Sequence, residues 1–536
     1  MMLNNKETTK KVIILLIFAI AIIIRIVKWP LTVEEINCDE AMTAINAKAI
    51  SETGCDMYGT SLPVYFEAWL VGGQSALLTY LMSISIKIFG FSIMSIRFPS
   101  LIISIISIFI FDKLVKIIFE DNYKIRVIML LVLALNPWHI MQSSWALDCN
   151  LFPHFMLYAI YFLIKGVKQN KKYLYISIVL FGITLYTYGI ALYATPVFLV
   201  ISYLYLLKNK KIKISDAIIS VLIFIIISCP IISMSVINLL GLPTVKIGNI
   251  TIQEFEYFKR TGDMLLFSQD LLQTLINNIL TTIKLVLINE DGLSWNAIHG
   301  VGTIYIGSII FAIVALIEII ASKKQKNDSG ISIIIIWFIT SIIIGMLINN
   351  VNINRLNIIW YPIIFLVGYG IYIILNKCKF NKLLLCTIVT IYFIYFAFFI
   401  EKFYSTDYNR CYTWSNGLID TVRQAEKNSN KEEVYIQDSI INNDRNRVFL
   451  IYETIKDYQK YNFINREILL ECYQREEKKV FSEWLAKTTN IRIINMNKIE
   501  ENMKYIILYK KETDNLLENY NAKEYESYKI MYKKGE

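Results

Sequence analysis

Charged residues are scarce in this chain of 536 residues. Asp, Glu, Lys and Arg make up 18% of it, whereas a soluble globular protein carries about 25%. Hydrophobic residues reach 55%, and many apolar runs approach the roughly 20 residues that cross a bilayer as a helix. This excludes a soluble protein, and it also excludes a membrane barrel, whose strands give short alternating segments. The chain is therefore predicted to be a polytopic α-helical membrane protein, because helices satisfy their own backbone hydrogen bonds in lipid.

Several motifs are missing as well. The sequence has no Walker loop, no Gly-x-Gly-x-x-Gly after a strand and no Asp-x-Asp, so an enzyme of this kind would use an activated donor that needs no cytoplasmic nucleotide site. The eight cysteines contain no Cys-x-x-Cys, and their spacing supports no disulfide framework. The three histidines are His139, His154 and His299, and they lack the spacing of a zinc motif. Separate hydrogen-bonding roles are favoured over a shared metal, and a divalent cofactor stays open.

The net charge of +10 does not form the single basic patch of a nucleic-acid-binding protein. Lys and Arg recur in short loops between apolar runs, which marks those loops as cytoplasmic. The basic loops are 1–11, 113–126, 165–173, 208–213, 323–329 and 376–382. About eleven spans fit between them, near 12–29, 97–117, 127–142, 152–166, 173–189, 191–207, 216–236, 301–321, 331–348, 357–375 and 383–400. This threading predicts a multi-pass protein of the plasma membrane with a cytoplasmic N-terminus.

One apolar run has to be left out of this count. If residues 74–90 crossed the membrane, every later basic loop would lie outside, so we expect this run to lie at the outer surface or to dip in and return. Ser, Thr and Lys87 within it are typical of an interfacial helix. Residues 41–53 are also amphipathic and are expected to form a second such helix in the first outer loop, 30–96.

The last part of the chain changes character. Residues 1–400 are predicted to form the transmembrane domain, and residues 401–536 a small extracytoplasmic α/β domain. Strands are predicted at 433–438, 447–452, 491–496 and 504–509, and a helix at 475–488.

Asp39 and Glu40 are the first candidates for chemistry, because carboxylates kept beside a membrane are costly and mark functional sites. Side chains of adjacent residues on a helix point about 100° apart, so one of the two is expected to face a site. A carboxylate in a dry cleft can serve as a general base. The pair is equally compatible with a helix start, in which Asp39 caps the helix over 41–53 and Glu40 interacts with its dipole.

Asp148 is the second acidic candidate. It lies in a stretch rich in Trp, His and Pro, residues 136–155, at the predicted outer mouth of two spans. A loop aspartate with only structural hydrogen bonds is the alternative. His139 and His299 are expected on the same outer side and are predicted, with Tyr188, to contact substrate.

Arg355 begins an outer helix end with no acidic neighbour in the sequence. A guanidinium there suits a phosphate, which it can bind with two hydrogen bonds and a permanent charge. The alternative is an interfacial arginine whose head group reaches water. Arg97 raises the same choice, and a structural role is favoured for it.

At this point the sequence resembles a known family. The first span followed by an acidic pair, "DEAMTAINAKAISETGCDMYG", then an apolar run that ends in Phe-Gly and Arg-x-Pro-Ser, is similar to the family 39 glycosyltransferases of the GT-C superfold. That family includes protein O-mannosyltransferases and the aminoarabinose transferase that modifies lipid A. "NPWHIMQSSWALDCNLFP" and "NINRLNIIWYPIIFLVGYGI" resemble later blocks of the family. The resemblance covers about residues 12–400. The richness of the chain in Ile, Lys, Asn and Tyr indicates an AT-rich genome and predicts a bacterial source.

The resemblance implies a GT-C fold with two juxtamembrane helices in the first outer loop. It also implies a polyprenyl-phosphate sugar donor and a transfer that inverts the anomeric centre. Asp39 would be the catalytic base, and Asp148 would stand at the family's second acidic position. The sequence departs from the family there, since Asp148 replaces the commoner Glu and Ser144 replaces an Arg. Arg355 would neutralise the phosphate that leaves.

The acceptor is left open between a protein, a glycopolymer and a lipid. A transporter or flippase of lipid-linked sugars is the alternative function, and it would predict paired charges or broken helices near the middle of the bilayer. The charged residues gather instead at the outer helix ends.

Overall fold

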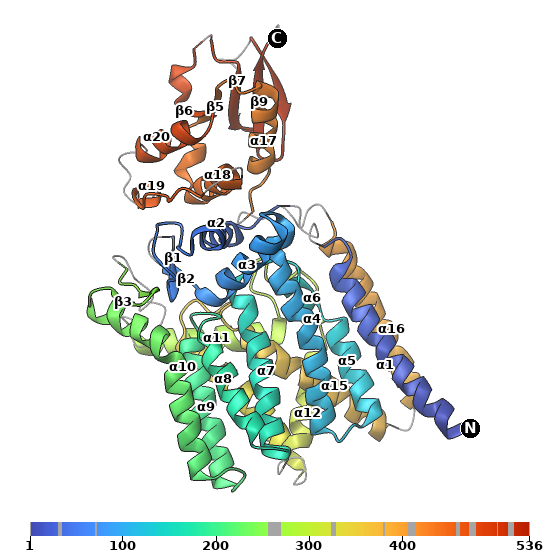
Figure 1. The fold of residues 1–536 in the computed structure, drawn as a ribbon. Helices are drawn as coiled ribbons and strands as arrows, with labels where there is room; N and C mark the ends of the chain where they lie inside the picture. Colours follow the sequence, from blue (N-terminus) through green and yellow to red (C-terminus); the bar gives the residue numbers. More distant parts are fainter. Residues whose placement is uncertain are drawn as a thin grey trace.

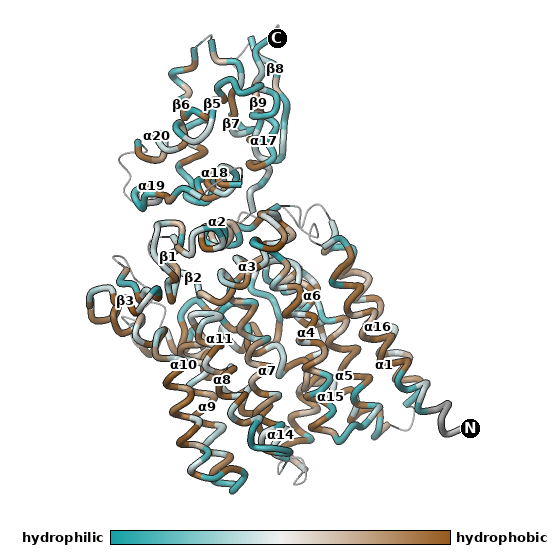
Figure 2. The backbone as a smooth tube through the Cα atoms, viewed as in Figure 1, coloured by the Kyte–Doolittle hydropathy of each residue, from teal (hydrophilic) through white to brown (hydrophobic). Residues whose placement is uncertain are grey.

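The chain folds into a helical body that carries a small α/β domain at one end (Figure 1). The computed structural model describes residues 2–29, 35–69, 72–255, 270–322, 328–378, 381–405, 414–456, 461–470, 479–500, 502–512 and 519–534. Hydrophobic residues dominate the helical body, whereas hydrophilic residues dominate the C-terminal domain and the lower helix ends (Figure 2). This distribution suits a body embedded in lipid with an aqueous domain above it.

Each of the eleven predicted spans coincides with helical structure. The helices are α1 (Met2–Ile26), α4 (Ile93–Ile118), α5 (Tyr123–Ala134), α6 (Pro137–Gln142), α7 (Asp148–Lys168), α8 (Lys172–Thr184), α9 (Ala191–Lys208), α10 (Ile214–Leu240), α12 (Ile309–Ala321), α14 (Ser329–Leu347), the 3-10 turn η3 (Asn357–Ile359) with α15 (Trp360–Lys377), and α16 (Asn381–Phe403). Within the described part of the chain, six helices are long and apolar enough to cross a membrane, namely α9, α10, α11 (Leu271–Ile288), α14, η3 with α15, and α16. The polytopic helical fold is confirmed.

No span was predicted between 216–236 and 301–321, so helix α11 was missed. Polar residues interrupt the apolar pattern of α11. One of them, Asn278, is buried and donates to the carbonyl oxygen of Met346 in α14 at 3.1 Å. Neighbouring helices therefore satisfy polar groups that a hydropathy reading counts against a span. A short hairpin of β3 (Val245–Ile247) and β4 (Ile250–Ile252) precedes α11.

Residues 30–96, predicted to be the first outer loop and called so below, contain both expected helices, α2 (Cys38–Thr53) and α3 (Ala76–Phe89). The hairpin β1 (Tyr65–Ala68) and β2 (Gly72–Ser75) joins the two helices. A capping box of Asn37 and Glu40 begins α2, and Gly54 ends it with a φ of 73°. Twelve of the residues of α2 are buried, so α2 lacks the exposed polar face expected of an interfacial helix. The reason is that α3 packs on one side of it and α18 on another.

The C-terminal domain is built on a five-stranded sheet with the strand order β6-β5-β7-β9-β8. Strands β5 (Val434–Gln437), β6 (Ile491–Ile494) and β7 (Tyr505–Tyr509) are parallel, and β8 (Tyr520–Glu524) and β9 (Tyr528–Lys533) are antiparallel. The helices are α17 (Leu418–Ser429), α18 (Asp444–Lys456), α19 (Glu467–Leu470) and α20 (Lys479–Thr488). Of the helix predicted over 475–488, residues 475–478 lie outside the described residues.

The prediction of a strand over 447–452 is wrong, because these residues lie in α18. All six side chains are buried, since α18 lies within the C-terminal domain and also packs against α2. A short apolar run that is buried on all sides has no periodicity that separates a helix from a strand.

The C-terminal domain is docked on the first outer loop by specific polar contacts. The Glu35 carboxylate accepts hydrogen bonds from the backbone N–H groups of Asn416 and Gly417, both at 2.6 Å. Farther along, the N–H of Tyr461 donates to Glu52 at 2.8 Å. The C-terminal domain therefore contacts both the residues directly before α2 and the helix α2 itself.

The contact at Glu35 predicts a pH dependence of stability. The pKa of the Glu35 carboxyl is raised from 4.5 to about 7, mainly by burial and also by the nearby Glu526 carboxylate, while the hydrogen bonds from Gly417 and Asn416 act to lower it. Between these two pH values the folded protein keeps a proton that the unfolded chain has lost, so stability falls as pH rises through this window. Glu35→Gln lacks this titration, and its thermal unfolding temperature relative to wild type should rise from pH 5 to pH 8. Parallel pH curves for the two proteins would contradict this assignment.

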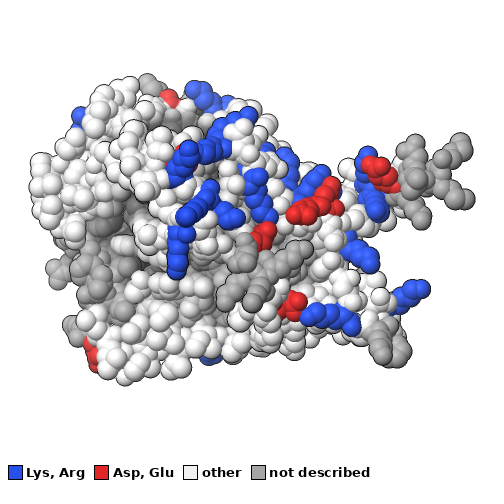
Figure 3. Space-filling model, turned by 90° about the horizontal axis from the view of Figure 1, so that it is seen from below, with Lys and Arg blue, Asp and Glu red and all other residues white. Residues whose placement is uncertain are grey.

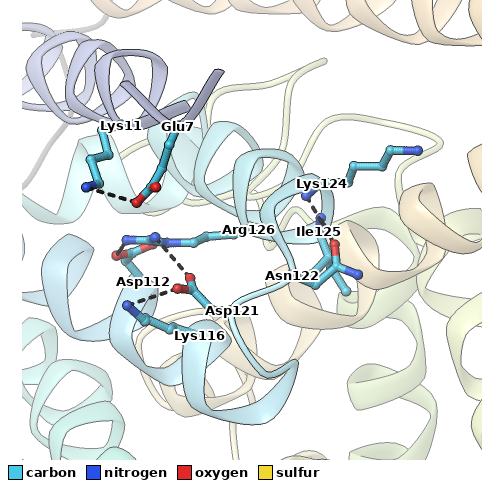
Figure 4. A network of polar contacts seen from close by, with 9 residues as sticks. All are labelled: Glu7, Lys11, Asp112, Lys116, Asp121, Asn122, Lys124, Ile125 and Arg126. Atoms are coloured by element: carbon cyan, nitrogen blue, oxygen red, sulfur yellow. Dashed lines mark hydrogen bonds and ion pairs between the residues drawn. The ribbon is translucent and has the colours of Figure 1, made fainter. Parts of the chain in front are cut away.

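Lys and Arg side chains gather on the face opposite the C-terminal domain (Figure 3). There Arg126 binds both oxygens of Asp112 at 2.6 Å and one oxygen of Asp121 at 3.2 Å, and Lys116 also pairs with Asp121 (Figure 4). The N-terminus lies on this basic side of the helical body (Figure 1). Residues 323–327 of one predicted basic loop lie outside the described residues. That the basic face is cytoplasmic stays a prediction.

Candidate active site

Asp39 lies in the first turn of α2, and its side chain is exposed. The indole Nε1–H of Trp69, which directly follows β1, donates to Asp39 Oδ1 at 2.8 Å. The side-chain amide of Gln74 in β2 donates to the backbone oxygen of Asp39 at 3.0 Å. The N-cap is Asn37, whose side chain accepts from the Asp39 N–H. Asn37 therefore caps the helix, so the Asp39 carboxylate does not serve as the N-cap.

Asp148 is the first residue of α7 and is partly buried. Its Oδ2 accepts a hydrogen bond from the backbone N–H of Ser75 at 3.1 Å, and Ser75 follows directly after the Gln74 that holds Asp39. The negative charges of Asp148 and Asp39 both act on the thiol of Cys149. Two carboxylates far apart in the sequence are thus brought to one place by the hairpin β1–β2. Each also lies at a helix N-terminus, where the helix dipole favours a negative charge.

Glu40 points into the protein and is fully buried. Arg97 in α4 donates to both of its oxygens, at 3.0 and 2.9 Å. The same carboxylate accepts from the backbone N–H of Ala146 at 2.6 Å and of Asn37 at 3.1 Å. Glu40 therefore joins α2, α4 and the loop before Asp148, and these contacts favour the structural role predicted for Arg97. The catalytic role predicted for Glu40 stays a prediction, and its contacts are those of a residue that positions others.

His139 lies in α6 and is fully buried. It accepts a hydrogen bond from Arg25 of α1 at 3.0 Å. Arg25 also donates to the backbone oxygens of Ala21, Leu133 and Ala134. The buried guanidinium of Arg25 is thus satisfied by several acceptors, and these hydrogen bonds stabilise the packing of α1 against the neighbouring helices. This environment favours a structural role for His139 over contact with substrate.

The remaining predicted site residues are held in their own loops. His299 is exposed, and its ring lies 2.9 Å from Glu290. Arg355 is partly buried and donates to the backbone oxygen of Asn349 at 2.7 Å. Tyr188 is partly buried and packs against two hydrophobic clusters of the helical body. Their predicted contacts with substrate stay predictions. Among the described residues, no group of three or more His, Cys, Asp or Glu side chains is placed to hold a metal ion.

The hairpin β1–β2 is the part of the site that sequence reasoning missed. It supplies Trp69 and Gln74, which contact Asp39, and Ser75, which contacts Asp148. The signal was the glycine pair in "WLVGGQS", since a glycine pair between short runs is typical of a hairpin. Gly73 is required there, because a Cβ would overlap the ring of Tyr65 and the backbone oxygen of Phe66.

Comparisons with known proteins agree with this architecture. A family model described as dolichyl-phosphate-mannose-protein mannosyltransferase matches residues 74–233, less than half of the chain. No curated protein matches. Among solved structures, ArnT from Cupriavidus metallidurans bound to undecaprenyl phosphate superposes with a TM-score of 0.57 at 10% identity, over 97% of each chain. The Archaeoglobus fulgidus oligosaccharyltransferase in its apo form gives 0.51 at 12% identity, over 93% of this chain and 69% of that one. AglB from the same organism, in complex with an inhibitory peptide and a dolichol-phosphate, gives 0.52 at 11% identity, over 94% and 70%.

The chain has the GT-C glycosyltransferase fold. It is a multi-pass membrane protein, as predicted. At identities this low the structural likeness establishes the fold alone, so membership of family 39 stays a prediction.

Proposed function

We propose that this chain is an inverting glycosyltransferase, which moves a sugar from a polyprenyl-phosphate donor to an acceptor hydroxyl on the outer face of the plasma membrane. The observation that carries the proposal is that Asp39 and Asp148 both contact the segment of the hairpin β1–β2. This hairpin lies on the side of the helical body that faces the C-terminal domain (Figure 1). The family match and the fold support the same activity. The structures of ArnT with undecaprenyl phosphate and of AglB with dolichol-phosphate support a donor of this chemical class.

In the proposed reaction, Asp39 is the general base. It accepts the proton of the acceptor hydroxyl as that oxygen forms a bond to the anomeric carbon. The bond from the anomeric carbon to the phosphate oxygen breaks, and the lipid phosphate leaves with the electron pair on the opposite face of the sugar. Inversion follows from this single displacement. A base of this kind contributes about 10²–10⁴-fold to the rate.

The other candidate residues take supporting roles in this proposal. Asp148 shares the site as a second acid, and Glu40 with Arg97 fixes the start of α2 against the loop before Asp148. Arg355 is retained as the cation that binds the leaving phosphate, where charge develops in the transition state. His299 and Tyr188 are retained as candidates for substrate contact.

The test is a transfer assay with the purified full-length protein in lipid nanodiscs. The donor probe is tritium-labelled hexosyl undecaprenyl phosphate, and cell-envelope membranes supply protein, glycopolymer and lipid acceptors. Label that moves from the donor into any acceptor supports the proposal, and fractionation of the product identifies the acceptor class. A parallel assay with EDTA decides whether a divalent metal is needed. Donor flipping in proteoliposomes without transfer would favour the transporter, and the absence of both activities would contradict the proposed enzyme.

A further inference from the structure

We infer that Trp69 is a positioning residue for the base: its indole N–H orients the Asp39 carboxylate toward the acceptor hydroxyl. This inference rests on the proposed function. The direct observation is the hydrogen bond from Trp69 Nε1 to Asp39 Oδ1 at 2.8 Å. A donor to one carboxylate oxygen fixes the rotamer of the side chain and directs the other oxygen, which the proton transfer requires.

The backbone of Trp69 supports the inference independently. Its φ is 56°, a left-handed conformation that glycine adopts at no steric cost and a bulky side chain adopts only with strain. Such strain is characteristic of functional sites, where the surrounding structure imposes it. Here the strained residue is the one whose side chain contacts the proposed base. A turn that needed only the backbone geometry would be served better by glycine.

The hairpin β1–β2 gives Trp69 a rigid support. Tyr65 to Ala68 pair in register with Ser75 to Gly72. The hydroxyl of Tyr65 donates to the backbone oxygen of Gly73 at 3.0 Å, across the hairpin. Strand β2 contributes the groups that hold the backbone of Asp39 and the side chain of Asp148. The two strands of one hairpin, with Trp69 directly after the first, therefore supply the contacts to both acids.

The charges around Asp39 explain why a donor is needed there. Asp148 from α7 is a like charge, and both acids act on Cys149; a like charge disfavours ionisation of a carboxyl group. The charges of Asp444 and Arg445, at the start of α18, also act on the thiol of Cys38, which directly precedes Asp39. A hydrogen bond to the charged form favours that form. The indole N–H and the N-terminus of α2 thus both favour the charged form of the Asp39 carboxyl group, which is the form that a general base requires.

The experiment is the pH profile of kcat/KM for Trp69→Phe, which keeps an aromatic ring and removes the N–H. The acidic limb reports the ionisation of the base in the free enzyme. We expect this limb to move to higher pH by about one unit, since the lost bond had stabilised the carboxylate. We also expect kcat to fall about tenfold, which is less than the roughly 10²–10⁴-fold expected for loss of the base itself, with KM little changed. A purely structural role for the tryptophan would leave the limb in place.

Two further variants make the result specific. Trp69→Gln retains an N–H donor four bonds from Cα, and its acidic limb should lie near that of the wild type. Tyr65→Phe removes a hydrogen bond of the same hairpin without touching Asp39, and its limb should not move. An unshifted limb in an active Trp69→Phe protein, or equal shifts in all three variants, would overturn the inference alone. Failure of the wild type to transfer sugar would overturn the proposed function and this inference together.

Discussion

Replacing Asp39 with asparagine is expected to slow sugar transfer by about 10²–10⁴-fold. Asparagine cannot take the proton of the acceptor hydroxyl, but it has nearly the same shape and can still accept the hydrogen bond of Trp69. The fold should be unaffected, because the Asp39 side chain is exposed and the helix is capped by Asn37 instead. The measurement is the initial rate of transfer, together with the thermal unfolding temperature of both proteins.

The matched control for this prediction is Asp420→Asn. Asp420 is an exposed carboxylate of the C-terminal domain that makes a long ion pair with Arg423 at 3.5 Å, so its loss should leave the transfer rate unchanged. A rate for Asp39→Asn within a few-fold of the wild type would remove Asp39 as the base. In that case Asp148→Asn becomes the decisive variant, because Asp148 is the second carboxylate at the site.

The transmembrane body could be predicted from the sequence because its signal is direct. A span is a run of apolar residues, and its orientation is encoded in the basic loops that flank it. Parity predicted that residues 74–90 form a helix at the outer surface; α3 forms there and packs against α2, and its side of the membrane stays a prediction. The same reading failed at α11, whose polar residues find partners on a neighbouring helix. A hydropathy scale scores each residue by itself and holds no information on the hydrogen-bond partner that a polar side chain finds in the folded protein.

Of the candidate site, the sequence could predict only the charged residues. A carboxylate beside an apolar run is unusual enough to be noticed, so Asp39, Glu40 and Asp148 were all candidates. Apart from the family resemblance, which implied that Asp39 is the base, nothing in the sequence separates Asp39 from Glu40, because the difference is the direction of each side chain. In the structure one carboxylate is exposed and contacts Trp69, and the other is buried against Arg97. The pairing of residues this far apart in the chain depends on tertiary packing.

Removing the charge of Glu40 is expected to have the largest effect on stability. The ion pair of Glu40 and Arg97 has both side chains fully buried, and breaking such a pair costs about 3–5 kcal/mol, because the remaining charge is left uncompensated. Glu40→Gln should therefore sharply lower the folded yield and the unfolding temperature. Activity should fall with the amount of folded protein. The measurement is the unfolding temperature in detergent, with the specific activity of the folded fraction.

A double variant separates this structural role from a catalytic one. In Glu40→Gln with Arg97→Met, the glutamine oxygen can keep the hydrogen bond from the N–H of Ala146, only the N–H of Asn37 loses its acceptor, and no buried charge is left without a partner. Replacing a whole buried pair by groups of similar size is often close to neutral, so stability and activity should both recover relative to Glu40→Gln alone. If stability recovered without activity, Glu40 would act in the chemistry itself, as the sequence first suggested. If both recover, Glu40 serves to hold the start of α2, and with it Asp39, against the loop that carries Asp148.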